Sequence, residues 1–164
     1  MKDNLLILGA GGYGNVARET AEAMGCFAKI DFLDDKNPVA IDKLDALTRY
    51  VSDYEWAFVA MGNPQLRLHL LKELQSAGFE VAKLIHPSAV VMPSAKLEAG
   101  VIIEALAVVN SNTVISRGCI ISAGAVVNHD CVLAEGCHID CNATVPARSR
   151  VPENTKVQCG AVYI

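Results

Sequence analysis

The residue types best suited to chemistry lie in the run Val127-Asn128-His129-Asp130-Cys131. A histidine next to a carboxylate can act as a general base, because the carboxylate fixes the tautomer of the imidazole and raises its basicity. We therefore predict that His129 and Asp130 are catalytic and that both side chains lie outside the core. The competing interpretation is a solvated turn that carries no chemistry.

A second group of candidates lies near the N-terminus, in Gly9-Ala10-Gly11-Gly12-Tyr13-Gly14, which has the spacing G-x-G-x-x-G. A short apolar run, residues 5–8, precedes this turn, and a helix over residues 15–24 is predicted after it. Glycines let a backbone approach a phosphate closely, and the start of a helix favours negative charge. The acidic pair Asp34-Asp35 ends the next predicted strand, where such folds place a carboxylate that binds ribose. A tight turn beside a solvated acidic loop is the alternative.

The elements around these glycines alternate between strand and helix. The sequence predicts further strands over residues 30–33, 56–61 and 80–85, a helix over residues 65–77, and a polar connector over residues 38–50. Such alternation is typical of a small parallel α/β sheet, and it places Gly62 on the same carboxyl edge as the glycine turn. A sheet of this size is half of a dinucleotide-binding fold. This argues against a nicotinamide cofactor and favours a mononucleotide or a nucleotide-sugar.

The remainder of the chain repeats every six residues, from Ala89 to its end. The first position of nearly every hexad is small, and the third is large and apolar throughout: Val91, Leu97, Ile103, Val109, Ile115, Ile121, Val127, Leu133, Ile139, Val145, Val151, Val157 and Tyr163. A period of six fits neither a helix nor a single strand, but it is typical of a three-sided parallel β-helix. The third-position residue points into the prism, and the stacked coils form three parallel sheets.

Three hexads make one coil, so residues about eighteen positions apart stack on one another. His129 then lies at a corner of the prism, over Ser111 and under Ala147, two small neighbours that leave its ring accessible. His138 falls on another side of the triangle. It could therefore meet His129 only across an interface between subunits.

The charge and hydropathy of the chain exclude several classes of partner. The net charge is -4 and there is no basic block, so neither nucleic acid nor an anionic membrane is expected. The N-terminal apolar run is too short for a signal peptide, and no stretch reaches the length needed to span a bilayer. These features predict a cytoplasmic protein.

The six cysteines are expected to be small buried fillers in a reducing compartment. Cys119, Cys131 and Cys137 occupy the small first position, while Cys141 and Cys159 share the fifth position with alanines. None of the spacings is C-x-x-C, so neither a disulfide framework nor a zinc site is predicted.

The order of these motifs resembles one known family. GAGGYG is followed by FLDD, then by MGNPQLR and the junction IHPSA, and finally by hexads that carry NHDC with His138 nine residues after His129. From Leu5 to about Thr144, the chain resembles the bacterial sugar acetyltransferases of the sialic acid O-acetyltransferase and UDP-4-amino-sugar N-acetyltransferase (bacillosamine pathway) type. That family is part of the hexapeptide-repeat superfamily.

The resemblance implies a half-Rossmann α/β domain over residues 1–85 that binds a UDP-sugar or related sugar substrate. It implies a left-handed parallel β-helix over residues 86–164, and a homotrimer in which acetyl-CoA lies between neighbouring β-helices. By the same resemblance His129 would take a proton from the sugar, Asp130 would raise the basicity of His129, and His138 from the adjoining subunit would contact acetyl-CoA. The positions that match those of the nucleotide-sugar site are Gly11, Gly12, Tyr13, Asp34, Asp35 and Gly62.

The resemblance favours direct transfer of an acetyl group from acetyl-CoA to the amine of a nucleotide-activated amino sugar. No covalent enzyme intermediate is expected, because the cysteines are predicted to be buried, and no metal is expected. A sugar hydroxyl, as in sialic acid, is the alternative acceptor. The β-helix after His129 is shorter than is usual in the family, residues 130–164 making about two coils. A non-catalytic sugar-nucleotide-binding protein with a degenerate acetyl-CoA groove is therefore the alternative function.

Overall fold

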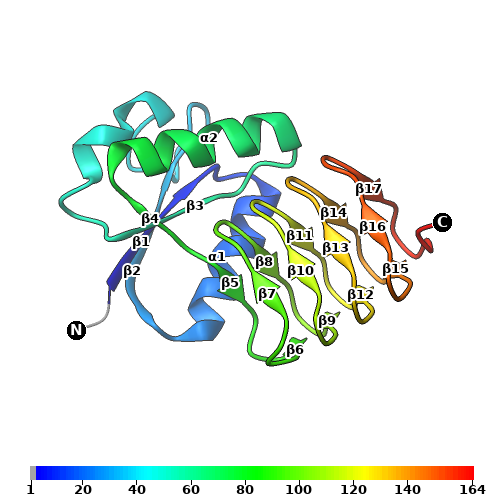
Figure 1. Ribbon diagram of the computed structural model, residues 1–164. Helices are drawn as coiled ribbons and strands as arrows, with labels where there is room; N and C mark the ends of the chain where they lie inside the picture. Colours follow the sequence, from blue (N-terminus) through cyan, green and yellow to red (C-terminus); the bar gives the residue numbers. More distant parts are fainter. Residues whose placement is uncertain (1–2) are drawn as a thin grey trace. The chain divides into compact units, whose positions relative to one another are not determined.

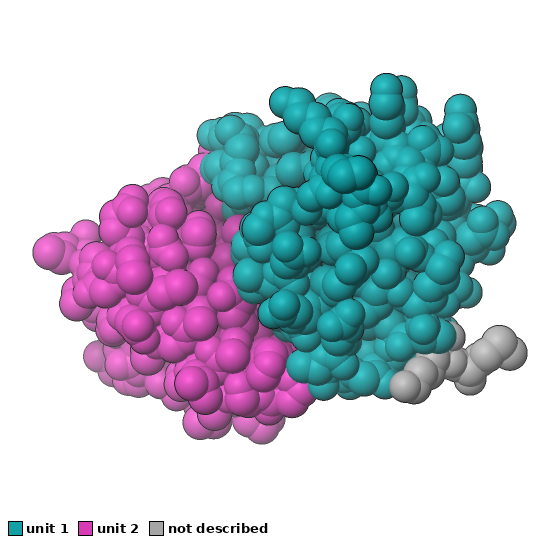
Figure 2. Space-filling view, turned by 180° about the vertical axis from the view of Figure 1, so that it is seen from behind, with its two compact units in different colours: residues 1–82 teal, residues 83–164 magenta. Residues whose placement is uncertain are grey.

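The computed structural model describes residues 3–164 as two compact units, one that ends at Ala82 and one that begins at Lys83 (Figure 1; teal and magenta in Figure 2). The prediction of a single strand over residues 80–85 is wrong. Strand β4 (Glu80–Val81) pairs with β3 (Trp56–Val59), whereas β5 (Leu84–Ile85) pairs with β8 (Ile102–Ile103) in the second unit. The chain therefore divides after Ala82 rather than after Ile85, because Leu84 and Ile85 already belong to the repeat.

The first unit is a parallel four-stranded sheet in the order β2-β1-β3-β4. Its elements in chain order are β1 (Asp3–Leu8), α1 (Gly12–Met24), β2 (Phe27–Leu33), the 3-10 helix η1 (Leu44–Tyr50), β3, α2 (Pro64–Ala77) and β4. The alternation predicted from the sequence is confirmed, with a longer second strand and a shorter third strand than expected. β1 is buried from Leu5 to Leu8 because it lies in the middle of the sheet.

Local sequence sets the ends of the two α-helices. Asn63 caps α2, since its side chain accepts a hydrogen bond from the backbone N–H of Leu66, and Pro64 takes the first helical position. Gly25 and Gly78 end the two helices in the left-handed conformation, with φ of 66° and 100°. Each helix follows a strand through a short turn, α1 after β1 and α2 after β3, so both begin at the carboxyl edge of the sheet.

The second unit is a left-handed parallel β-helix, as predicted (Figure 1). Its three sheets have the orders β17-β14-β11-β8-β5, β15-β12-β9-β6 and β16-β13-β10-β7, and we call them sheets B, C and D. The remaining strands are two residues long: β6 (Val90–Val91), β7 (Lys96–Leu97), β9 (Val108–Val109), β10 (Val114–Ile115), β11 (Ile120–Ile121), β12 (Val126–Val127), β13 (Val132–Leu133), β14 (His138–Ile139), β15 (Thr144–Val145), β16 (Arg150–Val151) and β17 (Lys156–Val157). Neighbouring strands pair in register, as Val126 does with Val108 and Thr144.

The core of the β-helix consists of the first and third positions of the hexads. The fully buried members include Val109, Ile115, Ile121, Val127, Leu133, Ile139 and Val145, with Ala107, Cys119, Ala125, Cys131, Cys137 and Ala143 between them. Such short and branched side chains fill a narrow prism without voids, and their burial supplies the main driving force for stacking.

The corners of the prism are built from the sixth positions. Every sixth position from Gly100 to Gly160 has a positive φ, between 56° and 72°. Glycine, asparagine and aspartate adopt this conformation readily, and they occupy all but two of these corners. The exceptions are Leu106 and Arg148.

The cysteine prediction is confirmed only in part. Cys119, Cys131 and Cys137 are buried in the prism, but Cys141 is half-buried, and Cys159 and Cys26 are exposed. The burial predicted for Cys159 is wrong because the fifth position lies at a corner, outside the core.

Leu106 should be a source of backbone strain, because its φ is 61° and its side chain is 70% exposed. Replacing Leu106 with asparagine should raise the free energy of unfolding by about 1 kcal/mol. Urea unfolding would measure this. Leu106→Ala is the control, since it shortens the side chain but keeps the unfavourable φ. Equal stability of the two variants would contradict the proposal that the positive φ of Leu106 strains the backbone.

Candidate active site

The predicted catalytic pair lies at the corner between β12 and β13. His129 Nδ1 is 2.7 Å from Asp130 Oδ2, and the two side chains are 46% and 44% exposed. The predicted accessibility of the pair is therefore confirmed. Asp130 has a φ of 59° at this corner, and its carboxylate contacts the ring of the preceding residue.

Neighbouring coils hold this pair from both sides. Asn112, one coil earlier, donates a hydrogen bond from Nδ2 to Asp130 Oδ1 at 3.2 Å. The backbone N–H of Arg148, one coil later, donates to the carbonyl oxygen of His129 at 2.9 Å. The hydrogen bonds from His129 and then Asn112 hold the pKa of Asp130 below its usual range.

The protonation pattern of His129 follows from its partner. An ionised carboxylate only accepts hydrogen bonds, so Nδ1 of His129 must carry a hydrogen. In the neutral ring, Nε2 then holds the lone pair and can accept a proton. The pair is therefore arranged as a general base with an orienting carboxylate.

Asn128 and Thr113 support the backbone of this corner, and the sequence did not single out either of them as a support. Asn128 accepts the N–H of His129 at 2.8 Å through its side-chain oxygen, and Asn110 one coil earlier donates to the same oxygen at 3.3 Å. Buried Thr113 donates its hydroxyl to the carbonyl oxygen of Asn128 at 2.8 Å. A buried threonine in a column of alanines and cysteines is the sequence signal that could have found it.

His138 lies on a different sheet from the His129 corner. It belongs to β14 in sheet B, whereas His129 follows β12 in sheet C. Within one chain the structure therefore does not bring these two predicted site residues together. The side chain of His138 is 20% exposed, and its Nε2 is 3.0 Å from Ser122 Oγ.

A buried glutamate is linked to this histidine through Ser122, and sequence reasoning missed it. Glu104 is 9% exposed; its Oε2 accepts the backbone N–H of Ala123 at 3.0 Å, and its Oε1 is 3.4 Å from Ser122 Oγ. Burial raises the pKa of Glu104, against the effect of these two hydrogen bonds. A single carboxylate inside the apolar stretch Val101-Ile102-Ile103-Glu104-Ala105-Leu106 is the signal that was available.

In the first unit, the glycines of the N-terminal turn divide into two kinds. A Cβ on Gly14 would collide with the carbonyl oxygen of Gly9, and Gly9 itself needs its φ of 102°. These two glycines therefore serve folding. Gly11, Gly12 and Gly62 have open space where a Cβ would stand, and none has a positive φ.

Asp34 ties the glycine turn to the loop that follows β2. Its Oδ2 accepts the N–H of Ala10 at 2.8 Å, and its Oδ1 accepts those of Lys36 and Asn37 at 2.8 and 2.9 Å. These backbone hydrogen bonds, that of Ala10 first, lower the pKa of Asp34. Asp35 instead accepts the N–H of Leu44 at the start of η1. The acidic pair thus faces two different segments.

Two further residues shape the same edge of the sheet. Tyr13 lies half-buried in the first turn of α1. Arg67 on α2 is 1% exposed and donates from Nη1 to the carbonyl oxygens of Met61 and Gly62, at 2.7 and 3.1 Å. Arg67 therefore holds the turn after β3, a role that sequence reasoning missed.

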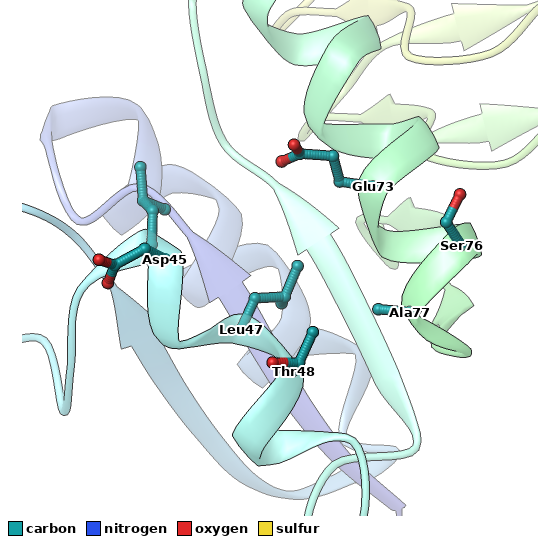
Figure 3. Close-up of a pocket in the computed structure, with 7 residues that line it drawn as sticks. Asp45, Leu47, Thr48, Glu73, Ser76 and Ala77 are labelled. Atoms are coloured by element: carbon teal, nitrogen blue, oxygen red, sulfur yellow. The ribbon is translucent and has the colours of Figure 1, made fainter.

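A hollow in this unit lies between η1 and α2, lined by Leu44, Asp45, Leu47, Thr48, Glu73, Ser76 and Ala77 (Figure 3). Its two charged side chains, Asp45 and Glu73, are acidic. Carboxylates repel phosphate, so this hollow is poorly suited to a nucleotide. Among residues 3–164 there is no group of three His, Cys, Asp or Glu placed to hold a metal ion, and no helix has the length and hydropathy needed to cross a bilayer.

Comparisons with known proteins agree with this architecture. Residues 4–74 match the PglD N-terminal domain family. The acetyltransferase domain of PglB from Neisseria gonorrhoeae, in complex with acetyl coenzyme A, is 33% identical with a TM-score of 0.95, over 99% of this chain and 82% of that chain. PerB from Caulobacter crescentus, in complex with CoA and GDP-perosamine, is 30% identical with a TM-score of 0.78, over 98% of this chain and 88% of that chain. WeeI from Acinetobacter baumannii, 17% identical with a TM-score of 0.70 over 97% and 87%, shows the fold alone.

The fold and these similarities define an acyltransferase of the hexapeptide-repeat superfamily. More particularly, the chain belongs to the bacterial sugar acetyltransferases that carry a PglD N-terminal domain. The resemblance drawn from the sequence motifs is thereby confirmed.

Replacing Asp34 with alanine should lower the free energy of unfolding near neutral pH by about 1 kcal/mol, because three backbone N–H groups lose their acceptor. The pKa of Asp34 is lower in the folded state than in the unfolded chain. Its stabilisation is thus present above about pH 3.9 and is lost as the pH falls through the folded-state pKa. Urea unfolding across this range would show the difference in stability between wild type and variant shrinking in acid.

Asp35→Ala is the control, because it removes only one such hydrogen bond. It should lower the free energy of unfolding at neutral pH by less than Asp34→Ala does, and an equal loss would contradict the special role of Asp34.

Proposed function

We propose that this enzyme transfers the acetyl group of acetyl-CoA to the amine of a nucleotide-activated amino sugar, with His129 as the general base. The observation that carries the proposal is the 2.7 Å contact between His129 Nδ1 and Asp130 Oδ2 at an accessible corner of the β-helix. The similar PglB domain is described with acetyl coenzyme A. PerB, described with GDP-perosamine, is named a perosamine N-acetyltransferase, which favours an amine over a hydroxyl as acceptor.

In this mechanism Nε2 of His129 accepts a proton from the amine while the nitrogen attacks the thioester carbonyl. A C–N bond forms, the C–S bond breaks, and the proton leaves with the thiolate of coenzyme A as its thiol. Asp130 stabilises the charged imidazole between these steps. Direct transfer is supported by the buried state of Cys131, whose thiol pKa is raised by burial.

We place the sugar nucleotide at the carboxyl edge of the first sheet. Gly11, Gly12 and Gly62 have no steric need to be glycine in the fold itself, so close approach by a ligand is the reason that remains. The start of α1 has no side-chain cap and no acidic residue in its first turn, which leaves its N–H groups suited to a diphosphate. Tyr13, Asp34 and Asp35 complete the proposed site, with UDP as the first choice of nucleotide.

We also propose a homotrimer that assembles through sheet C. The outward second positions of this sheet form an apolar strip of Val90, Val108, Val126 and Val162, interrupted by Thr144. Val90 and Val162 are 48% and 57% exposed. Packing of this strip against a second copy would remove apolar surface from water. It would also let His138 of one subunit approach the His129 corner of another, with acetyl-CoA between them.

Replacing His129 with asparagine should lower kcat/KM by about 100-fold to 10,000-fold, with little change in thermal unfolding because the side chain is exposed. A coupled assay for free coenzyme A thiol, with UDP- and GDP-linked amino sugars as acceptors, would measure it. Loss of folding would make His129 structural, and unchanged activity would remove it from catalysis.

A mixture of His129→Asn and His138→Asn subunits tests whether the site is shared. If each site takes one histidine from each of two subunits, an equal mixture refolded together should have about one quarter of its sites intact. His129→Asn alone should be nearly inactive, and His138→Asn alone should act only with a raised KM for acetyl-CoA, so the intact quarter of the sites should be recognised by the wild-type KM. A mixture without any sites of wild-type KM for acetyl-CoA would contradict the shared site.

The glycines offer a matched pair for the nucleotide site. Gly12→Ala should leave thermal stability unchanged, since nothing lies within 4 Å of the added Cβ, but should raise the Kd of the sugar nucleotide about tenfold. Gly14→Ala should instead lower the stability, because its Cβ would collide with Gly9. Calorimetric titration with the sugar nucleotide and with acetyl-CoA would separate the effects. Unchanged sugar-nucleotide binding by Gly12→Ala would place the site elsewhere.

A further inference from the structure

Glu104, Ser122 and His138 form a continuous hydrogen-bonded chain on sheet B. Glu104 and Ser122 are eighteen residues apart and stack on adjacent coils, with Oε1 and Oγ 3.4 Å apart. Ser122 Oγ in turn lies 3.0 Å from Nε2 of His138, on the next coil. Both Glu104 and Ser122 are buried, at 9% and 4% exposed. Solvent therefore has little access to this chain, and a hydrogen that points the wrong way within it would be costly.

The direction of the hydrogen bonds in this chain follows from the acceptor at its start. Oε2 of Glu104 accepts the N–H of Ala123 at 3.0 Å, and an ionised carboxylate has no hydrogen to give. While Glu104 is ionised, Ser122 must therefore donate its single hydroxyl hydrogen to Oε1 of Glu104. Its oxygen can then only accept from His138, so Nε2 of His138 carries a hydrogen.

Ser122 itself is not arranged as a nucleophile. It is 4% exposed, so an acyl donor cannot reach its oxygen. The carboxylate of Asp140 lies 3.8 Å from the same Nε2 that Ser122 contacts, rather than near Nδ1, and it is paired with Lys156 at 3.0 Å. A serine–histidine–aspartate triad needs the carboxylate on the other ring nitrogen. The chain therefore orients the histidine and does not perform covalent catalysis.

We propose that Glu104 is a positioning residue that acts through Ser122 to fix the tautomer of His138, with the hydrogen on Nε2. The tautomer decides whether each ring nitrogen donates or accepts a hydrogen bond, so Glu104 sets how His138 meets its ligand. That ligand is acetyl-CoA under the function proposed above, and this part of the inference depends on that function. The tautomer itself does not.

Glu104→Gln gives a sharp test, because an amide has only one accepting atom. The amide oxygen must face the N–H of Ala123, since an NH2 group there would place two donors against each other. The NH2 group then donates to Ser122, and Ser122 donates to Nε2 of His138. The variant should therefore move the hydrogen of His138 from Nε2 to Nδ1.

The position of this hydrogen can be read from 15N NMR of histidine-labelled protein at about pH 9, where a typical imidazole is neutral. The chain has 4 histidines, and His138→Asn assigns the signals of His138. The wild type should show a protonated Nε2 and an unprotonated Nδ1, Glu104→Gln should show the reverse, and Ser122→Ala should show a mixture. A His138 spectrum that is identical in the wild type and both variants would overturn the proposal.

Glu98→Gln is a matched control on another side of the prism. Oε2 of Glu98 accepts the N–H of Arg117 nineteen residues later, at 3.0 Å, the same type of contact that Glu104 makes with Ala123. Glu98 follows β7 on sheet D, whereas His138 lies on sheet B, so this contact is separate from the hydrogen-bonded chain that ends at His138. Glu98→Gln should therefore leave the His138 spectrum unchanged while losing a comparable contact. A reversed tautomer in this control would mean that the effect on His138 is not specific to Glu104.

Kinetics separate this proposal from the proposed function. Glu104→Gln and Ser122→Ala should raise the KM for acetyl-CoA by about fivefold, the effect of one misdirected hydrogen bond, and leave the KM for the sugar nucleotide unchanged. A reversed tautomer with an unchanged KM for acetyl-CoA would support the role of Glu104 and overturn the assignment of His138 to acetyl-CoA. An unchanged tautomer with full activity would overturn the role of Glu104 and leave the proposed function intact.

Discussion

The register between stacked coils is the constraint on which the rest of the β-helix depends. Each strand is only two residues long, so one coil cannot hold its own side chains in place. Position comes from the backbone hydrogen bonds to the coils above and below, such as those from Asp130 to Ser111 and from Arg148 to His129, each 2.9 Å. The His129–Asp130 pair is held in this way by residues of the adjacent coils, and the chain from Glu104 to His138 is assembled from residues of three successive coils.

The corner conformation places a second demand on the same residues. Asp130 has a positive φ, which few side chains tolerate, and it also supplies the carboxylate that orients His129. Asparagine and glycine fit the backbone at such corners but bring no charge. Aspartate fulfils both requirements with one short side chain, so the local backbone and the chemistry of the site support the same residue type. Agreement of this kind between levels is typical of sequences that fold to one structure.

Periodic and local features of the molecule could be predicted from the sequence. The period of the third-position residues predicted the β-helix. The exposed pair was predicted from the adjacent residues His129 and Asp130, because neighbours in sequence remain neighbours at a corner. The chain from Glu104 through Ser122 to His138 could not be found by local motifs, since its members lie on three successive coils. The sequence also could not show that Gly9 and Gly14 serve packing while Gly11 and Gly12 face open space. That distinction depends on contacts with the neighbouring strand and helix.

The hexad period also limits how the β-helix can change in length during evolution. Inserting one residue between β12 and β13 would move every later side chain to a different face, so that apolar residues would turn outward and corner glycines would fall within strands. Gain or loss of a whole coil leaves all later positions in phase and adds or removes only one layer of core. Relatives of this chain should therefore differ by complete coils beyond the His129–Asp130 corner, whereas Asn112, Asp130 and Arg148 must keep their spacing of one coil between each neighbour.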